Sequence, residues 1–507
     1  MNGEQEKKMI ANAQRLPLEL LQEIKLQKQQ ASIHDHDSYI KSAGVRVSEE
    51  MNSVNAEVLN APLIIYKNEN MPKQVCDAVW DIKDVEFVKP AIINALLIIY
   101  NGVPHGVLLL PVKKILDQAR RLGMTIRNHD FLALRNDQLT FEFLEKTITQ
   151  YRDSYGVDFV LAIGTGSDFH NILKATEVST KIATQQVEPG TIKNPKLGGV
   201  TIGNILQKMN PKNGGYNQYF QQAVPSQINS DRIDVFQSFL QTTMVMGFYM
   251  SHPSPGSNEE QPSVCGYSFS INKRGNVARG GFVFTKPRQS ILSEVELRKP
   301  FEDATKLYYQ ENNSYPQRVL VYRFGTSDGE ISKIQGDECP QMLECLAAGM
   351  NGQIPQLTVI AVRRQHNTRI FKQKNSINPR DRAPAQNVTP GSCVAGANPF
   401  DVVMVPHRAL QGTAKPTIFS TIFPGPEEND LTQNFLKNIT HAFCYMHEIV
   451  NSPISVPHTL RSAEQMANRG TKLWHSKSHE FPPLAPEELY AHATNALNPL
   501  IETRYWA

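Results

Sequence analysis

Apolar residues along the chain fall into short continuous runs that alternate with amphipathic stretches. After an opening segment with a helical pattern at residues 9–30, the run AIINALLIIY at residues 91–100 predicts a buried strand. Amphipathic helices are expected at residues 112–124 and 137–155, and a second buried strand at 157–164. Strands that alternate with helices in this order are typical of a parallel, doubly wound sheet.

A second unit with an alternating pattern begins near Asp231. Residues 241–251 predict a strand, and residues 264–285 have the pattern of a hairpin. Strands and helices then alternate, with strands expected at 317–325, 356–364, 401–410 and 416–423, and helices at 293–312, 339–350, 431–450 and 459–470. A mixed α/β layer with an antiparallel hairpin in front fits an RNase H-like fold, although periodicity alone also fits other α/β folds.

Composition limits the class of protein. A chain of 507 residues with 40% apolar content is expected to fold into two or three globular domains. The longest apolar run is interrupted by Asn94 and is far shorter than the roughly 20 residues that a membrane span needs. The charged N-terminus is followed by no apolar segment of a secretory signal, so a cytoplasmic location is expected, with the nucleus or RNA granules as alternatives. The six cysteines form no CxxC pair, which argues against a zinc site or a disulfide framework.

Charge is more informative locally than overall. The formal net charge of +3 does not by itself indicate a nucleic-acid partner. Between residues 363 and 382, however, there are seven Lys or Arg and a single acid, Asp381. Such density suits a segment that follows a phosphate backbone, while a solvated basic loop is the alternative.

A glycine turn follows the strand expected at 157–164. Gly164-Thr165-Gly166-Ser167 leads into a helix-like pattern at residues 170–186, and free N–H groups at a helix start favour an anion. An ordinary strand-to-helix turn is the alternative. His170 and Lys174 are four residues apart, so they share a helix face and can point to one phosphate.

This stretch resembles the MID domain of the Argonaute family, which anchors the 5′ phosphate of a guide strand. The family motif has a Tyr, a Lys four residues later, a Gln in an ATQ sequence, and two further Lys, the last before LGG. The resemblance places His170 at the Tyr position and matches Lys174, Gln185 and Lys196, which precedes Leu197-Gly198-Gly199. Either ring can stack on a base, and a protonated His170 would add positive charge.

Two departures from the family motif concern the last lysines. The remaining family Lys falls on Ile192, with Lys193 next to it. The interval between Gln185 and Lys196 is also too short for the helix that the family places there. The guide 5′-phosphate site implied by the resemblance therefore comprises His170, Lys174, Gln185, Lys193, Lys196 and Arg469.

The second unit resembles the PIWI domain, whose cutting site needs clustered carboxylates to hold two divalent cations. At the four positions that the resemblance assigns to this site, the chain has Tyr249, Ser290, Phe324 and Glu464. A single carboxylate cannot hold two divalent ions, so we expect no metal, no cofactor and no RNA-cutting enzyme. A working nuclease would require ligands elsewhere, and a repacked apolar site is the expected alternative.

Other PIWI motifs are intact. Residues 363–369 and 407–416 (HRALQGTAKP) match segments that contact the guide backbone in the family. The contacting positions implied by the resemblance are Arg364, Gln365, Asn367, Arg369, His407, Gln411, Thr413 and Lys415. Arg469 matches the family's helix arginine at the 5′-phosphate pocket, and the aromatic end Tyr505-Trp506-Ala507 is similar to the family's C-terminus.

These observations predict an α/β chain with a Rossmann-like MID domain followed by an RNase H-like PIWI domain. We expect a linker segment at residues 1–85, MID at 86–225 and PIWI at 226–507; no segment resembles the family's N or PAZ domain. The resemblance implies a non-cutting Argonaute, similar to the worm-specific secondary type, that binds guide and target RNA and recruits silencing effectors. An RNA-free scaffold or competitor is the alternative.

Overall fold

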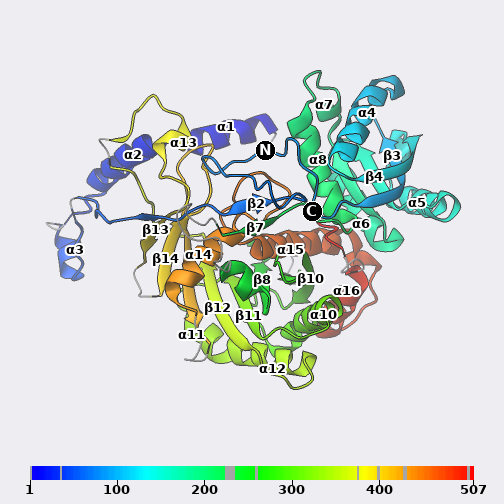
Figure 1. The fold of residues 1–507 in the computed structure, drawn as a ribbon. Helices are drawn as coiled ribbons and strands as arrows, with labels where there is room; N and C mark the ends of the chain where they lie inside the picture. The colour runs from blue at the N-terminus through cyan, green and yellow to red at the C-terminus, as the bar shows by residue number, and fades with distance from the viewer. Residues whose placement is uncertain are drawn as a thin grey trace.

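The computed structural model describes residues 3–34, 37–48, 50–222, 235–256, 261–373, 376–396, 400–425, 431–498 and 503–507. Two α/β units face each other, and the C-terminus lies where they meet (Figure 1). The expected boundary at residues 225 and 226, and the start of the second unit near Asp231, lie outside the described residues.

The first unit is a four-stranded parallel sheet in the order β4-β3-β5-β6. Its strands are β3 (Ile92–Tyr100), β4 (Thr125–Ala133), β5 (Phe159–Ile163) and β6 (Ala183–Val187). The helices are α4 (His105–Arg121) and α8 (Gly199–Lys212) on one face, and α5 (Phe141–Tyr155) and α6 (Ser167–Thr180) on the other. Successive residues of β3 alternate between the two cores, since Ile98 lies in one and Leu97 in the other. The doubly wound arrangement expected from the sequence is therefore confirmed.

Strand β6 corrects the helix-like pattern expected at residues 170–186. Helix α6 ends at Thr180 because Lys181 adopts a left-handed conformation with φ of 58°, and the chain then turns into the strand. The side chains of β6 now face helix α6 and helix α8 alternately, which places polar groups between them.

The second unit is a nine-stranded mixed sheet in the order β1-β13-β14-β15-β12-β11-β8-β9-β10. Its strands are β1 (Glu57–Val58), β8 (Thr243–Ser251), β9 (Ser263–Ser270), β10 (Ala278–Thr285), β11 (Arg318–Phe324), β12 (Gln356–Arg363), β13 (Ser392–Ala395), β14 (Asp401–Val405) and β15 (Thr417–Phe423). The expected hairpin is β9 and β10, and β8, β11 and β12 run parallel. The mixed α/β fold is thereby confirmed.

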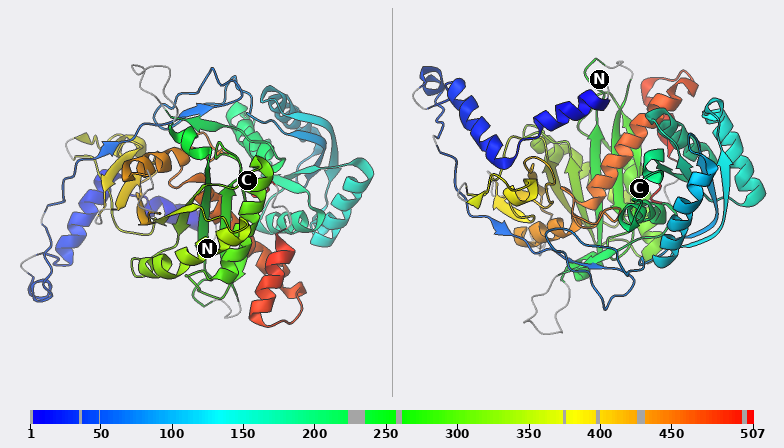
Figure 2. Two further views of the ribbon diagram at one scale, coloured as in Figure 1. Left: turned by 60° about the horizontal axis from the view of Figure 1, so that its bottom comes forward. Right: turned by 90° about the horizontal axis from the view of Figure 1, so that it is seen from above.

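Helices cover both faces of the large sheet (Figures 1 and 2). Helices α10 (Glu294–Asn312) and α12 (Cys339–Gly349) pack on one face, and α14 (Gln433–Phe443) and α15 (His458–Lys477) on the other. Helix α15 approaches so closely that a Cβ at Gly266 would lie 2.0 Å from the carbonyl oxygen of Ala463. This glycine allows the helix to cross the sheet and reach the first unit.

The remaining described elements connect or flank the two units. They are α1 (Gly3–Ala13), α2 (Pro17–Gln30), α3 (Ser38–Ser42), β2 (Leu63–Ile65), η1 (Asn136–Gln138), α7 (Pro189–Ile192), β7 (Tyr219–Gln221), α9 (Val235–Leu240), α11 (Ile331–Lys333), η2 (Ile334–Glu338), α13 (Ala383–Gln386), η4 (Ser478–Glu480) and α16 (Pro486–Leu497). Strands β2 and β7 pair in a small sheet of their own. Of the helices described, none has the length and apolar character to cross a membrane.

Candidate nucleic-acid interface

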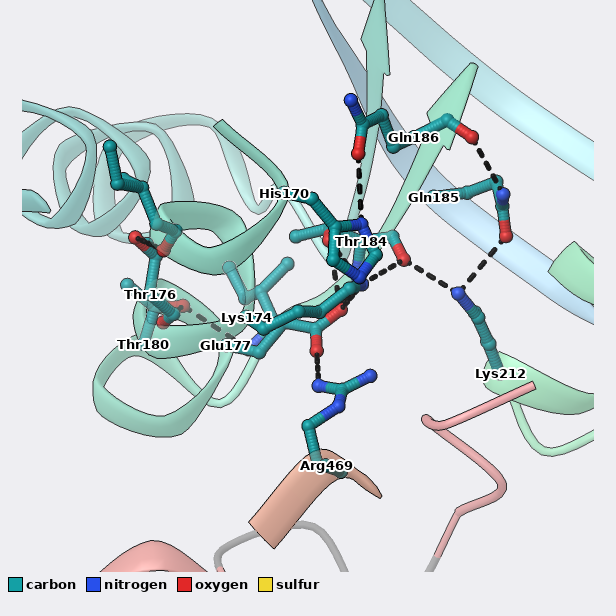
Figure 3. Close-up of polar contacts among 12 residues, drawn as sticks. His170, Lys174, Thr176, Glu177, Thr180, Thr184, Gln185, Gln186, Lys212 and Arg469 are labelled. Carbon is teal, nitrogen blue, oxygen red and sulfur yellow. Dashed lines mark hydrogen bonds and ion pairs between the residues drawn. The ribbon is translucent and has the colours of Figure 1, made fainter. Parts of the chain in front are cut away.

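Charged side chains from both units meet in a buried group between them (Figure 3). We define the basic cluster as Lys174 and Glu177 on α6, Gln185 on β6, Lys212 at the end of α8, and Arg469 on α15. All five are buried. Burial of this many charges costs free energy unless they are paired, so their contacts decide what the cluster can bind.

The two lysines of the basic cluster converge on one backbone carbonyl. Lys174 Nζ donates to the Thr184 carbonyl oxygen at 3.2 Å and to Thr184 Oγ1 at 3.0 Å. Lys212 Nζ donates to the same carbonyl oxygen at 2.8 Å and to Gln185 Oε1 at 3.0 Å. Because the two ammonium groups share an acceptor, their positive charges lie close together.

Glu177 is the carboxylate of the basic cluster. It accepts from Lys174 Nζ at 2.7 Å and from the Thr184 amide at 2.7 Å, and it pairs with Arg469 across the two units. Three basic side chains therefore face a single acid. Among the residues that the structure describes, Glu177 is the acid that acts on these cations, and an anionic ligand would add further negative charge.

The pKa values of the basic cluster reflect this imbalance. Burial alone would raise the pKa of Glu177, but Lys174 and Arg469 outweigh it and hold that pKa at about 2. Burial lowers the pKa of Lys174 to about 8 although Glu177 favours the charged form. Burial and the neighbouring Lys174 lower the pKa of Lys212 well below its usual range. Burial and neighbouring positive charges thus disfavour the charged forms of both lysines, and a bound anion would stabilise those forms.

His170 faces strand β6 one helical turn before Lys174, as its spacing predicts. Its Nδ1 lies 2.8 Å from Gln186 Oε1. Burial, followed by the charge of Lys174, lowers the pKa of His170 to about 4. A lowered pKa favours the neutral ring, so stacking on a base is the role that the free protein best supports for His170.

The structure brings Lys212, and not Lys193 or Lys196, into the basic cluster. Both of the latter side chains are exposed, and Lys193 Nζ donates to the Gly102 carbonyl at 3.0 Å. Lys212 also precedes a glycine pair, in Asn213-Gly214-Gly215. Helix α8 lies between Gln185 and Lys212, whereas the shorter interval from Gln185 to Lys196 holds only the four-residue α7. The glycine pair is a sequence signal for Lys212, whereas the exact match at Leu197-Gly198-Gly199 indicates Lys196.

A second group lies on the large sheet and α15, at positions that the family resemblance assigns to the cutting site: Tyr249 on β8, Phe324 on β11 and Glu464 on α15. The rings of Tyr249 and Phe324 stack with centroids 4.6 Å apart and planes at 9°. The Glu464 carboxylate accepts from Arg364 Nη2 at 2.9 Å and from Arg461 Nη1 at 2.6 Å. Ser290 hydrogen-bonds with Glu330 instead. This donor set does not fit a pair of divalent cations, and no group of three His, Cys, Asp or Glu positioned for a metal occurs among the described residues.

Comparison with models of protein families identifies the family of this chain. The family model described as the Piwi domain matches residues 157–475, which is more than half of the sequence. The chain belongs to the Argonaute/Piwi family. The match extends from strand β5 of the first unit to the last turn of α15. It therefore includes all five residues of the basic cluster.

Individual Argonaute relatives agree with this assignment. The chain is 25% identical to protein argonaute-2 of Drosophila melanogaster over 487 residues, covering 91% of this chain and 37% of that protein. It is 27% identical over 326 residues to the nuclear RNAi defective-3 protein of Caenorhabditis elegans, covering 60% of this chain and 30% of that protein. The chain thus spans about a third of the length of these relatives.

Solved Argonaute structures share the fold. The Kluyveromyces polysporus Argonaute with a guide RNA gives a TM-score of 0.78 at 17% identity, covering 99% of this chain and 62% of that one. The C-terminal lobe of a budding yeast Argonaute gives a TM-score of 0.72 at 18% identity, covering 89% of this chain and 95% of that one. The two α/β units are therefore those of the MID-PIWI lobe of Argonautes.

The two segments that resemble Argonaute guide-contacting motifs lie together after β12 and β14. His366 Nε2 is 2.9 Å from the Pro416 carbonyl oxygen, which joins them. Gln365, Asn367, Gln411 and Lys415 are exposed, while Arg369 donates to nearby carbonyls. Arg364 is instead bound to Glu464, and burial lowers the pKa of His407 to about 4.

The N-terminal segment contacts one of these motifs. Gln14 Nε2 donates to Gln411 Oε1 at 2.9 Å, and Thr413 Oγ1 donates to the Arg15 carbonyl at 2.8 Å. At the other end of the chain, the Arg469 guanidinium lies 5.4 Å from the ring centroid of Tyr505. The C-terminal Tyr505 thus contacts the basic cluster through Arg469.

Proposed function

We propose that the chain binds a small guide RNA, pairs it with complementary target RNA, and silences the target by recruiting effector proteins without cutting it. The observation that supports guide binding best is the basic cluster, in which three buried basic side chains from both units face one carboxylate. A 5′ phosphate matches this charge and its hydrogen-bond donors. Base pairing with the guide would then supply the sequence specificity.

The proposed absence of cutting is supported by the side chains at the second group. Tyr249 and Phe324 stack where the family resemblance places carboxylates, and Glu464 is already paired with two arginines. Two-metal hydrolysis needs several hard oxygen ligands around both cations. Silencing would therefore depend on partners, acting in the cytoplasm, the nucleus or RNA granules.

An RNA-free scaffold is less consistent with the basic cluster. A protein that binds no anion would gain nothing from three buried cations around one acid, because unpaired buried charge is costly. The finer proposal of a worm-specific secondary type is supported by the Caenorhabditis elegans relative and by the altered cutting site. For that type we expect a guide with a 5′ triphosphate to compete better than one with a monophosphate.

Purified protein tests the main proposal. We expect it to bind short 5′-phosphorylated RNA more tightly than the same RNA with a 5′ hydroxyl, with an affinity that falls as salt rises. Guide-loaded protein should release no product from a matched target in Mg²⁺ or Mn²⁺. Fluorescence anisotropy and gel analysis measure the two results. Equal affinity for both 5′ ends would contradict guide anchoring, and a cleaved target would contradict the absence of cutting.

Binding of a 5′ phosphate should also be linked to protons. In the free protein the pKa of Lys174 is about 8 and that of Lys212 is also lowered, and a bound anion would raise both. Between about pH 7 and 9 the complex would then hold more protons than the free protein, so affinity should fall as pH rises through this window. The phosphate itself is already a dianion there, because its second pKa is about 6.

Calorimetry in two buffers with different ionisation enthalpies measures this proton uptake. The same RNA with a 5′ hydroxyl is the control, since it leaves the basic cluster without an anion. Identical binding enthalpies in the two buffers would show that the lysines do not change protonation, and the link between the basic cluster and the phosphate would fail.

A further inference from the structure

Two arginines converge where the family resemblance places the metals. Arg364 follows strand β12, and Arg461 lies on α15, one turn before Glu464. Both donate to the Glu464 carboxylate, one to each oxygen, at 2.9 and 2.6 Å. We define these three residues as the arginine pair and its carboxylate. The arrangement joins the end of a central strand to the helix that crosses it.

The charge of this group is not balanced. Two guanidinium groups share one carboxylate, which leaves one positive charge in excess. The Glu464 side chain is 13% exposed, whereas those of Arg364 and Arg461 are 28% and 39% exposed. The carboxylate thus lies below and the cations face solvent, so the excess charge is available to a ligand.

Aromatic rings hold the first arginine in place. The Arg364 guanidinium carbon lies 5.0 Å from the ring centroid of Phe324, and Phe324 stacks in turn on Tyr249. A guanidinium positioned against an aromatic face keeps its planar set of donors in a fixed direction. Arg364 also hydrogen-bonds with Tyr249. These contacts and those with Glu464 use only part of the five N–H donors of each arginine, so further donors remain for an oxygen-rich ligand.

We propose that Arg364 and Arg461 bind a backbone phosphate of the target RNA at the position where a cutting Argonaute would hold its metals. The inference rests on the proposed function and deepens it. In two-metal hydrolysis the cations lie on either side of the phosphate to be cut. Here two guanidinium groups supply positive charge at that place, and planar forks suit phosphate oxygens. The site would therefore hold the target without activating water.

A phosphate of the guide strand is the other source of the same chemistry. Arg461→Gln removes one of the two charges, and Arg298→Gln on α10 is the matched control. Arg298 also pairs with a glutamate on its own helix, Glu294, but on the opposite face of the sheet. Guide affinity, target affinity of guide-loaded protein and melting temperature are measured for each variant.

We expect Arg461→Gln to leave guide affinity within about twofold and to weaken target binding about tenfold, with a salt slope reduced by about 1. Arg298→Gln should change neither. Neutral methylphosphonate linkages placed one at a time along each strand then locate the phosphate. One linkage in the target should weaken binding to the original protein and have little further effect in Arg461→Gln.

The outcomes separate this inference from the proposed function. Coupling to a linkage in the guide, or coupling to no linkage, would overturn target binding by the arginine pair while leaving guide binding intact. Failure of the unsubstituted protein to bind any 5′-phosphorylated guide would overturn the proposed function and this inference with it. Arg461→Lys adds a further arm, because it keeps the charge but loses the fork and should recover only part of the affinity.

Discussion

Replacement of Lys212 by Met should weaken binding of a 5′-phosphorylated RNA by about 10- to 100-fold, because a hydrogen bond between charged groups contributes roughly 1.5–3 kcal/mol. Lys212 Nζ is buried and lies between Thr184 and Gln185, beside Lys174. Methionine fills a similar volume without charge, so the loss should concern the ligand more than the packing. Anisotropy titrations with 5′-phosphate and 5′-hydroxyl RNA measure it.

Lys196→Met is the matched control. Its side chain is exposed and outside the basic cluster, so affinity should stay within about twofold of the original. The two variants decide between the lysine that matches the family motif by letters and the lysine that the fold places in the cluster. A strong loss in Lys196→Met with none in Lys212→Met would reverse the assignment. Unchanged binding in both would separate the basic cluster from the phosphate.

Much of the fold could be predicted from apolar runs. Strands β3, β5 and β8 are mostly apolar segments whose residues are largely buried, and such segments are visible in the sequence. Strand β4 was missed because it is an edge strand whose residues are mostly exposed, so its pattern is polar. Strand β6 was absorbed into a helix because its polar letters continue a helical pattern, and only the backbone at Lys181 ends that helix.

Some residues of the candidate sites can be found from local sequence motifs, and others only from the fold. Lys174 and Gln185 belong to local motifs, and the fold brings them together with Arg469, which comes almost 300 residues later. The place of Glu177 depends on how α6 and β6 pack, which no local pattern states. Lys212 has a local signal only in the glycine pair that follows it, and its place in the cluster depends on the packing of α8. Arg461 could have been noticed as a basic residue three positions before Glu464, the spacing of neighbours on a helix face. Its pairing with the same carboxylate as Arg364 required the fold.

Glu338→Gln should lower the free energy of unfolding by about 3–5 kcal/mol, the cost of removing one partner of a fully buried ion pair. Arg323 and Glu338 are both 0% exposed and form two hydrogen bonds, at 2.7 and 3.2 Å. Glu338 also accepts from the Leu292 amide. Urea unfolding measures the loss, and Glu294→Gln in the exposed pair on α10 is the control, expected to cost less than about 1 kcal/mol.

Loss of the Arg323–Glu338 ion pair should also affect the arginine pair, Arg364 and Arg461. The Arg323 guanidinium donates to the carbonyl oxygens of Phe324 and Ser290, each at 2.6 Å, so it fixes the backbone below the aromatic stack. If Glu338→Gln frees Arg323 from its position, Phe324 should shift and Arg364 should lose its support. We therefore expect target affinity to fall while guide affinity, set by the distant basic cluster, stays unchanged. If Glu338→Gln proves as stable as Glu294→Gln, the buried ion pair does not make the expected contribution to stability.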